Sequence, residues 1–476
     1  MNKFYITTPI YYINDIATIG HAYTTTAADV IARWNRSKGK DTFFLTGLDE
    51  NSQKTIDAAK KAGVKDIKKY TDDMAKKWKN VWKELNITND DFIRTTEERH
   101  IKVVEKFFKK VYDKGDIYKG TYEGLYCEGC EAFYLEKDLV NGKCPYHKKE
   151  PKLIKEENYF FRLTKYSDKV LNYIQKNPDF ILPKERRNEV ISFIKEGLKD
   201  TSISRPNVEW GIPLPTDEKH HFWVWFDALV NYISGAEKYW PADLHLLAKD
   251  ILRFHCVLWP AMLMSAGYKL PKTLFVHGFL TIDGQKMSKS LGNAINPLVL
   301  KEKYGVDPLR YFLIREIPFG QDGNFSEESL KKRINNELAN ELGNLISRTL
   351  NLCKKLPEIK KSPVEIKFEI KNIEKLMDEY KLTEALNEIW RYVQETNKYI
   401  NDKEPWKLEG KELEKVLYNC LESIRKISVL LWPFIPETSE RIFSLLNISQ
   451  LNLTEFNKEI KSYNVKKPEV LFNKII

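Results

Sequence analysis

The chain of 476 residues is longer than a single hydrophobic core usually serves, so we expect roughly two to four domains. Its composition, 42% hydrophobic and 30% charged, is that of a soluble globular protein, and no stretch approaches the roughly 20 apolar residues that a membrane span needs. The net charge of +10 at pH 7 suits a polyanionic partner but could equally reflect a bias in base composition.

The N-terminus and the cysteines indicate where the protein works. The chain enters an apolar segment at Phe4 without the basic region and small-residue cleavage site of a signal peptide. Six cysteines in a chain of this length do not make a disulfide framework. We therefore expect a cytoplasmic protein without a membrane partner.

The first fifty residues predict a β-strand, an α-helix and a second β-strand. Residues 3–13 are apolar, β-branched and aromatic, residues 20–37 carry apolar side chains at helical spacing, and residues 41–48 are again strand-like. Strands joined through one helix lie parallel, so we predict an α/β fold with a doubly wound, Rossmann-like parallel sheet. Strand-like and helical segments resume between residues 220 and 275.

The remaining pattern divides the chain. We predict the two halves of the α/β domain at 1–116 and 201–270, an inserted module at 117–200, a linking region at 271–327 and an all-α domain at 328–476.

The inserted module contains two pairs of metal-binding residue types. Cys127 and Cys130 form one pair, Cys144 and His147 form the other, and 13 residues separate the pairs. Three thiolates and one imidazole complete the closed tetrahedral shell of a structural zinc. A disulfide or a redox C-x-x-C is an alternative, which the absence of a secretory signal and the presence of the second pair disfavour. We predict one structural Zn²⁺ that folds the module.

Two short motifs about 265 residues apart each follow a predicted strand. The first, T-I-G-H at 18–21, stands where a strand gives way to a helix, so free N–H groups and the positive helix end can meet an anion. The second, K-M-S-K-S at 286–290, follows a strand-like run from Leu274 to Thr281, and its lysines can neutralise departing pyrophosphate. Alone, the first motif is more often a helix cap, and the second could be a solvated basic loop.

Together the motifs resemble the two signatures of class I aminoacyl-tRNA synthetases, which hold ATP above the carboxyl ends of a parallel sheet. Thr18 departs from the usual first His of the H-x-G-H signature. The resemblance implies that an amino-acid carboxylate attacks the α-phosphorus of ATP, with Mg²⁺, and that the aminoacyl group then passes to tRNA. The catalytic residues that it implies are Thr18, His21, Lys286 and Lys289.

Nearly the whole chain resembles the methionyl-tRNA synthetases, of the bacterial type with a single zinc knuckle. The blocks that carry this resemblance are TTPIYYIND, FFLTGLDEN, SISRPNVEWGIPLP, VWFDALVNYIS, KDILRFHCVLWPAML and FVHGFLTIDGQKMSKS. After Asp49 and Glu50 the family usually has His-Gly, whereas this chain has Asn51 and Ser52, to which we assign no role. The insert is too short for the editing domain of the isoleucine, valine and leucine enzymes.

The resemblance implies the residues of two substrate sites. Those for methionine are Ile10, Tyr12, Asp49, Trp225, Ala228, Tyr232, Ile251 and His255, with Asp49 accepting the ammonium group. Those for ATP are Gly20, His21, Lys249, Asp250, His277, Gly278, Lys286, Met287, Ser288 and Lys289. Aromatic walls suit a polarizable thioether, and one donor near the sulfur, such as Tyr12 or His255, would select methionine over isosteric aliphatic side chains. Without the family blocks, such apolar residues would ordinarily be plain core. Arg205 is a further candidate to approach the substrate.

The all-α domain carries a candidate RNA-reading face. Asn340, Asn344 and Arg348 share one helix face, and Pro405-Trp406 follows a predicted helix and a polar turn at 401–403. Such a face is usually only solvated, and such a Trp usually packs inward. The resemblance instead implies that Asn344, Arg348, Pro405 and Trp406 read the CAU anticodon of initiator and elongator methionine tRNA.

The sequence leaves other functions to be weighed. The end of the chain resembles the end of the family's helical domain without the dimerisation module of longer members, so we expect a monomer. A nucleotidyltransferase that uses no tRNA is one alternative, and a catalytically weakened, synthetase-like RNA-binding protein is another. The helical domain and the zinc module argue against the first, and only Thr18 points to the second.

Overall fold

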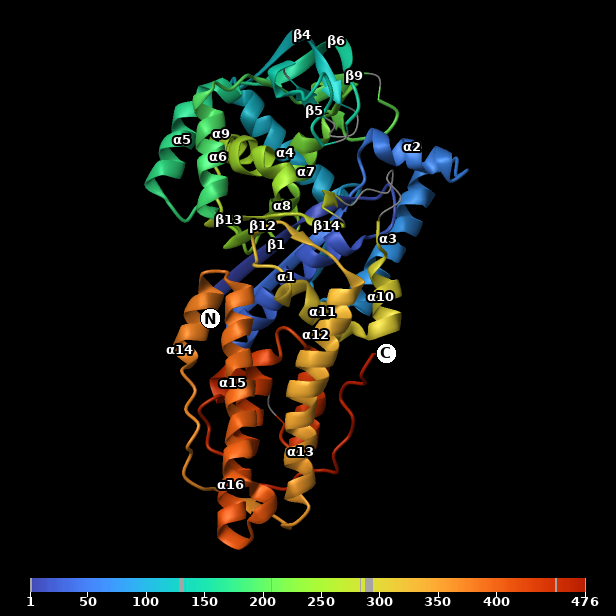
Figure 1. Ribbon diagram of the computed structural model, residues 1–476. Helices are drawn as coiled ribbons and strands as arrows, with labels where there is room; N and C mark the ends of the chain where they lie inside the picture. The colour runs from blue at the N-terminus through green and yellow to red at the C-terminus, as the bar shows by residue number, and fades with distance from the viewer. Residues whose placement is uncertain are drawn as a thin grey trace.

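The computed structural model describes residues 2–127, 132–134, 136–146, 148–206, 208–282, 284–286, 294–449 and 452–475. A six-stranded parallel sheet with the strand order β3-β2-β1-β12-β13-β7 lies at its centre (Figure 1). The strands are β1 (Lys3–Tyr12), β2 (Asp41–Asp49), β3 (Asp91–Arg94), β7 (Ile181–Leu182), β12 (Leu244–Ala248) and β13 (Thr273–His277). The predicted parallel α/β fold is confirmed.

The first βαβ unit forms as predicted. β1 pairs with β2 from Lys3 opposite Asp41 to Tyr12 opposite Asp49, and α1 (Ile19–Ser37) connects them. The register shifts between Thr7 and Ile10. This interval contains Pro9, which has no N–H to donate to a ladder.

Side chains of alternating strand residues enter different hydrophobic cores. On β13, Phe275 belongs to the core that includes α1, α3 (Ile67–Glu84) and α11 (Val306–Arg315). Its neighbours Leu274 and Val276 belong to the core that includes α4 (Glu98–Asp113) and α9 (Trp259–Ala266). Helices therefore cover both faces of the sheet, as the period of two along a strand requires.

The inserted part of the chain forms small antiparallel sheets at one end of the molecule (Figure 1). Its longest ribbon pairs β4 (Ile117–Cys127) with β6 (Lys152–Phe161), and β5 (Ala132–Tyr134) and β8 (Thr201–Ser202) flank this ribbon. A second sheet contains β9 (Ser204–Pro206), β10 (Pro213–Leu214) and β11 (Asp217–Phe222). The helices α5 (Ser167–Lys176) and α6 (Lys184–Lys195) bracket β7, so this part of the chain also supplies an edge of the central sheet.

One predicted strand is divided. The strand-like run from Leu274 to Thr281 was expected to be continuous, but β13 ends at His277, and β14 (Leu280–Ile282) belongs to another sheet, with β15 (Gln285–Lys286) and β16 (Gly323–Asn324). At Gly278 a Cβ would lie 2.4 Å from the backbone nitrogen of Asp322. The close approach of this second segment accounts for the glycine and for the break in the strand.

The C-terminal part is helical, as predicted. Its elements are α12 (Glu327–Arg333), the wider turns of η6 (Ile334–Gly343), α13 (Asn344–Cys353), α14 (Ile370–Asp378), α15 (Leu382–Lys403), η7 (Pro405–Lys407), α16 (Gly410–Leu431) and α17 (Pro436–Leu446). The first three follow one another without a break and lie alongside α15 and α16 (Figure 1). Across the described part of the chain, no helix combines the length and apolar character that crossing a bilayer demands.

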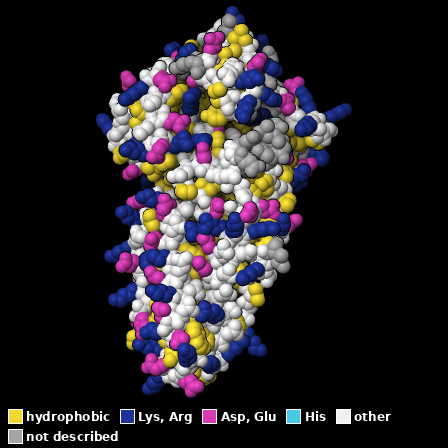
Figure 2. Space-filling view, in the orientation of Figure 1, with side chains coloured by type: hydrophobic (Ala, Val, Ile, Leu, Met, Phe, Trp, Pro, Cys, Tyr) yellow, Lys and Arg dark blue, Asp and Glu magenta, His cyan; other side chains and the backbone are white. Residues whose placement is uncertain are grey.

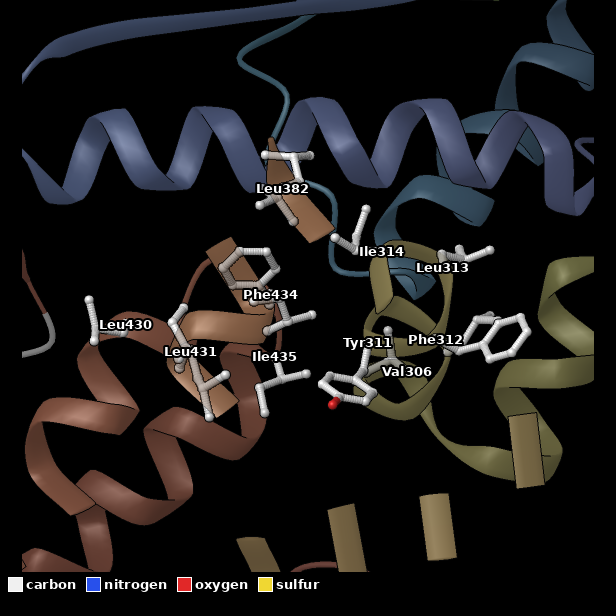
Figure 3. Close-up of a cluster of buried hydrophobic side chains, with 14 of the residues drawn as sticks. Val306, Tyr311, Phe312, Leu313, Ile314, Leu382, Leu430, Leu431, Phe434 and Ile435 are labelled. Carbon is white, nitrogen blue, oxygen red and sulfur yellow. The ribbon is translucent and has the colours of Figure 1, made fainter. Parts of the chain in front are cut away.

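A buried arginine joins the central body to this helical part. The guanidinium of Arg310 donates to Asp29 Oδ2 of α1 at 2.7 Å, and to the backbone oxygens of Pro433 and Phe434 at 3.0 and 3.1 Å. Burial alone would raise the pKa of Asp29, but Arg33 and Arg310 hold it at about 2. Around this arginine, side chains of α11, the start of α15 and the corner between α16 and α17 form one apolar cluster (Figure 3).

Candidate active site

A cleft of about 1070 Å³ opens at the carboxyl ends of the central strands. β2 and β3 lie on one side of β1, and β12 and β13 lie on the other, so the strand order reverses between β1 and β12. Open parallel sheets bind ligands at such a reversal. The predicted residues that line the cleft are Ile10, Tyr12, Thr18, Gly20, His21, Asp49, Trp225, Ala228, Tyr232, Lys249, Asp250, Ile251, His255, His277 and Gly278.

The start of α1 orients His21. The backbone N–H of Thr18 donates to Nδ1 of His21 at 3.0 Å, and the Thr18 hydroxyl lies 3.0 Å from the same nitrogen. Because Nδ1 accepts, the neutral ring carries its proton on Nε2. The rings of Tyr11 and Trp78 meet the imidazole edge-on at 5.0 and 5.2 Å. His21 is therefore a fixed donor at the N-terminus of a 19-residue helix.

The segment that follows the second motif is hydrogen-bonded to this same helix start. Met287, Ser288 and Lys289 lie outside the described residues, as does the side chain of Lys286. On either side of the motif, Gly284 and Ala294 line the cleft. The backbone N–H of Ile19 donates to the carbonyl oxygen of Ile295 at 2.9 Å. The residues on both sides of the second motif thus reach the cleft that Thr18, Gly20 and His21 of the first motif line.

Aromatic rings form one wall of the cleft. Trp225 of α7 (Val224–Leu229) stacks on Phe254, with ring centroids 4.0 Å apart. The ring of Tyr232 on α8 (Asn231–Ser234) packs against the ring of His245 on β12, with the ring centroids 4.2 Å apart. These contacts hold the aromatic side chains in place before any ligand is bound.

His255 cannot act as the predicted donor to a ligand sulfur. Its Nδ1–H donates to the carbonyl oxygen of Ile251 at 3.0 Å, and its Nε2 accepts from the Tyr232 hydroxyl at 2.6 Å. Burial lowers the pKa of His255 to about 4, so the ring is neutral at pH 7. Of the two donors that were expected, Tyr12 is therefore the one that remains.

A lysine that the sequence did not single out stands beside Tyr12. Lys54, on α2 (Gln53–Lys61), lines the cleft, and its ammonium lies 3.8 Å from the centre of the Tyr12 ring. Asp49, at the end of β2, lines the same cleft and is only 4% exposed. Lys54 follows Asp49 by five residues, but no local pattern indicated that the intervening turn would bring it back to Tyr12.

Lys249 forms an ion pair with an aspartate. Its ammonium lies 2.6 Å from Asp322 Oδ2, and Asp322 Oδ1 accepts the backbone N–H of Phe279 at 2.7 Å. Burial favours the neutral acid, but the hydrogen bond from Lys249 and that from the Phe279 backbone lower the pKa of Asp322 overall. Asp322 therefore links the ends of β12 and β13, and nothing in its sequence neighbourhood identified it.

His277 is fixed at the end of β13. Its Nδ1–H donates to the carbonyl oxygen of Gly278 at 2.7 Å, and its Nε2 lies 2.8 Å from the hydroxyl of Thr24 on α1. Burial lowers its pKa to about 4. The neutral ring joins the sheet to α1, and Thr24, which also lines the cleft, is a further residue that the sequence reading missed.

Arg205 contacts a residue of the cleft lining but does not itself line the cleft. Its guanidinium lies 3.7 Å from the ring centre of Tyr126 on β4, and Tyr126 lines the cleft whereas Arg205 does not.

Two of the predicted metal ligands are described. Cys127 ends β4, and Cys144 begins a tight turn in which its N–H donates to the oxygen of Lys149 and its oxygen accepts from the N–H of Lys148. Both cysteines are buried, at 4% and 1% exposure. Cys130 and His147 lie outside the described residues. Within the described ranges, no cluster of three metal-binding side chains occurs.

The candidate RNA-reading residues gather at an end of the helical part. Asn344 begins α13, Arg348 of that helix donates to Asn401 Oδ1 at 2.9 Å, and its guanidinium lies 6.0 Å from the Trp406 ring. Trp406 is 45% exposed although it is a large hydrophobic side chain, while Pro405 is buried. The polar turn predicted at 401–403 is wrong, because α15 continues to Lys403.

Charge alone does not locate a nucleic-acid surface. On the face in Figure 2, Lys and Arg side chains are spread over the length of the molecule among Asp and Glu side chains. The exposed ring of Trp406 beside Arg348 is therefore more informative than the charge distribution, since base stacking needs a specific platform.

Family sequence models match almost the whole chain. The model described as tRNA synthetases class I (M) matches residues 4–153 and 134–350. The model described as the anticodon-binding domain of tRNA ligase matches residues 365–474.

Whole proteins match over the same length. A methionine–tRNA ligase of Thermotoga maritima is 48% identical over 99% of this chain and 80% of its own length. One of Rickettsia conorii is 44% identical over 99% of both chains. The structure of Mycobacterium tuberculosis methionyl-tRNA synthetase in complex with methionyl-adenylate is similar with a TM-score of 0.95 and 38% identity, covering 99% of this chain and 100% of that one.

Proposed function

The chain belongs to the methionine–tRNA ligases of the class I tRNA synthetase family, and from this premise we propose which residues carry each part of the reaction. The enzyme activates methionine with ATP, which gives methionyl-adenylate and pyrophosphate. It then transfers the methionyl group to the 3′-terminal adenosine of methionine tRNA. The function is therefore that of the ligase and not of an inactive RNA-binding relative.

Activation requires two anions to be brought together. The methionine carboxylate attacks the α-phosphorus of ATP, a P–O bond forms, and the bond to the leaving pyrophosphate breaks. The Nε2–H of His21 and the N-terminus of α1 would donate to the phosphate oxygens, where negative charge increases. Thr18 would orient His21 through the backbone N–H that Nδ1 accepts. Mg²⁺ bound to ATP would neutralise part of the phosphate charge.

The other nucleotide contacts are assigned by position. Gly20, Lys249 and Asp250 would meet the phosphates and ribose, and His277 and Gly278 would flank the adenine. The observation that carries this assignment is the hydrogen bond from Ile19 to Ile295, which ties the helix start to the segment after the K-M-S-K-S motif. Lys286, Met287, Ser288 and Lys289 would then lie over the same phosphates, as in the family that the motif resembles.

Methionine would occupy the aromatic side of the cleft. Asp49 would accept the ammonium group, and Tyr12 would donate to the sulfur. Apolar contact would come from Ile10, Trp225, Ala228, Tyr232, Ile251 and the neutral ring of His255. A pocket built around one donor binds a thioether better than an isosteric aliphatic chain, because the donor stays unpaired with the wrong ligand.

The tRNA would contact the molecule at two distant places. Its 3′ end must reach the cleft, and its CAU anticodon would meet Asn344, Arg348, Pro405 and Trp406. Stacking of an unpaired base on the exposed Trp406 ring and hydrogen bonds from Arg348 suit single-stranded RNA. Initiator and elongator methionine tRNAs share this anticodon, so the same residues would read both.

Zinc would be held by Cys127, Cys130, Cys144 and His147. The burial of Cys127 and Cys144 and the tight turn that starts at Cys144 suit a closed Cys₃His site. Such a metal would fold the inserted ribbon and leave the chemistry to the cleft. Metal analysis of the purified protein should find about one zinc per chain, and Cys144→Ser should lose that zinc with melting of the inserted sheets.

The remaining features are proposed from the family. The catalytic domain would comprise residues 1–116 and 201–270, with the connective module at 117–200, a linking region at 271–327 and the anticodon-binding bundle at 328–476. The protein would act in the cytoplasm as a monomer. Sedimentation equilibrium of the purified chain tests the monomer.

Methionine-dependent exchange of labelled pyrophosphate into ATP tests the proposed function. The exchange should need methionine and should proceed far more slowly with leucine or isoleucine. Charging of methionine tRNA should require the CAU anticodon. Exchange without dependence on methionine would contradict the assignment, and so would charging that is indifferent to the anticodon.

A further inference from the structure

A buried carboxylate lies directly behind the aromatic wall of the cleft. Asp227 is on the short helix α7, between Trp225 and Ala228, and is 1% exposed. Trp225 and Ala228 line the cleft, whereas Asp227 does not. A buried carboxylate is costly unless both of its oxygens have partners. The groups that bind Asp227 therefore fix the position of α7.

One partner is Asn51, at the position where the chain departs from the resembled family and to which no role was assigned. Its amide donates to Asp227 Oδ2 at 2.8 Å and to the carbonyl oxygen of Thr95 at 3.1 Å. Asn51 is 7% exposed and follows Asp49 by two residues. The same amide thus connects the end of β2 with α7, which is 176 residues away in sequence.

The other partner is His100 on α4. Its Nε2 lies 2.6 Å from Asp227 Oδ1, and its Nδ1 lies 2.8 Å from the hydroxyl of Ser234 on α8. His100 is fully buried. Since Tyr232 lies on the same short helix as Ser234, His100 connects both wall helices to α4.

We propose that Asn51, Asp227 and His100 are positioning residues that set the width of the methionine pocket, between Asp49 on one side and Trp225, Ala228 and Tyr232 on the other. None of the three lines the cleft. They act on elements that carry pocket residues, which are the end of β2 and the helices α7 and α8. This inference rests on the proposed methionine site.

The ATP side does not depend on the same network. Lys249 and Asp250 follow β12, and His277 ends β13. Lys249 is held by Asp322, and His277 is held by the Thr24 hydroxyl and the carbonyl oxygen of Gly278. A defect in the network should therefore weaken methionine binding and leave ATP binding nearly unchanged, whereas general unfolding would impair both.

Asn51→Asp is the decisive variant. It keeps the size of the side chain but places a second carboxylate against Asp227. We expect the KM for methionine in pyrophosphate exchange to rise about tenfold or more, while the KM for ATP changes less than about twofold. Calorimetric titration with methionine alone should show the same loss of affinity. Asn51→Leu, which removes the donor without adding charge, should show a smaller loss.

The reciprocal exchange of the pair provides a rescue. In the double variant N51D/D227N, the amide of residue 227 can donate to the carboxylate at 51, so much of the lost methionine affinity should return. Asn419→Asp is the matched control, because Asn419 is also buried, at 1% exposure, and its amide donates to the oxygens of Pro363 and Lys415 in the helical part. It should lower the melting temperature and leave the KM for methionine unchanged.

The possible failures are distinguishable. A wild-type chain without methionine-dependent exchange would refute the proposed function itself. If the wild type is active, any one of three results would overturn the network. These are an unchanged KM for methionine in Asn51→Asp, an equal rise of the KM values for methionine and ATP in that variant, or a rise of the KM for methionine in Asn419→Asp as large as that in Asn51→Asp.

Discussion

The cleft and the anticodon end of the molecule are built on opposite principles. In the cleft, His255 and His277 are 2% exposed, and each has partners for both ring nitrogens. At the far end, Trp406 is 45% exposed and the Arg348 guanidinium lies 6.0 Å from its ring. A small ligand is enclosed by a fixed pocket, whereas a macromolecule must meet side chains that already face solvent.

Substitutions in the two regions should therefore have different effects. A change in the cleft disturbs a network of partners and should alter the chemistry or the amino-acid affinity. A change at the anticodon end removes one contact from a rigid helical support and should alter only the use of tRNA.

The largest effect is expected at the start of α1. His21→Ala removes a donor aimed at the phosphates, and the pyrophosphate exchange rate should fall about 100- to 1,000-fold. The affinity for methionine should change little, because His21 would act on the transition state. An equal loss of exchange rate and methionine affinity would contradict a role for His21 in the transition state.

Asp49→Asn should act next most strongly, on methionine alone. A hydrogen bond to a charged group is worth about 1.5–3 kcal/mol, so the KM for methionine should rise about 10- to 150-fold. The KM for ATP serves as the internal control. If both constants rise together, Asp49 supports the whole cleft and does not bind the ammonium group specifically.

Trp406→Ala should separate the two regions cleanly. Loss of one stacked base costs about 1–3 kcal/mol, so kcat/KM for tRNA should fall about 5- to 150-fold. Exchange in the absence of tRNA should stay at the wild-type rate. Tyr112→Ala, which removes another exposed aromatic ring (39%), is the matched control and should affect neither reaction. Reduced exchange in Trp406→Ala would mean that the two ends are not independent.

Acid should weaken the cleft side selectively. Burial lowers the pKa of His255 from 6.5 to about 4, so on acidification the unfolded chain binds the proton at a higher pH than the folded protein does. The stabilisation is complete above about pH 6.5 and is lost as the pH falls towards about 4.

Between pH 7 and pH 5 this one histidine should cost about 2 kcal/mol of unfolding free energy, measured by urea denaturation. His255→Gln should show a correspondingly shallower pH dependence, and Trp406→Ala should keep the wild-type slope. All eight histidines precede residue 278, so no histidine of the helical part should contribute to the pH dependence of the unfolding free energy. An unchanged slope in His255→Gln would contradict this reading.

The sequence predicted what depends on local pattern. β1, α1 and β2 formed where apolar periodicity indicated them, and the two signatures resembled a family whose fold is present. The prediction failed where contacts between distant segments determine the local structure. The break at Gly278 depends on the loop around Asp322, and the loss of His255 as a donor depends on Tyr232 and on the Ile251 carbonyl.

The least predictable residues were those that support others. Asp322 is 73 residues from Lys249, and Asn51 is 176 residues from Asp227. No periodicity connects such pairs, because each hydrogen bond exists only after the sheet has brought its strands together. A single sequence therefore does not indicate which of its distant side chains form hydrogen bonds with one another.

Arg310 limits how the enzyme can be shortened. A fragment that ends before residue 328 would keep Arg310 and Asp29 but would lose the carbonyl groups of Pro433 and Phe434. It would also expose residues of α11 to water, among them Tyr311, whose ring packs against Trp390 of α15, and Ile314 (Figure 3). A minimal catalytic fragment should therefore aggregate unless the corner at 430–436 is retained or these apolar positions are redesigned as surface.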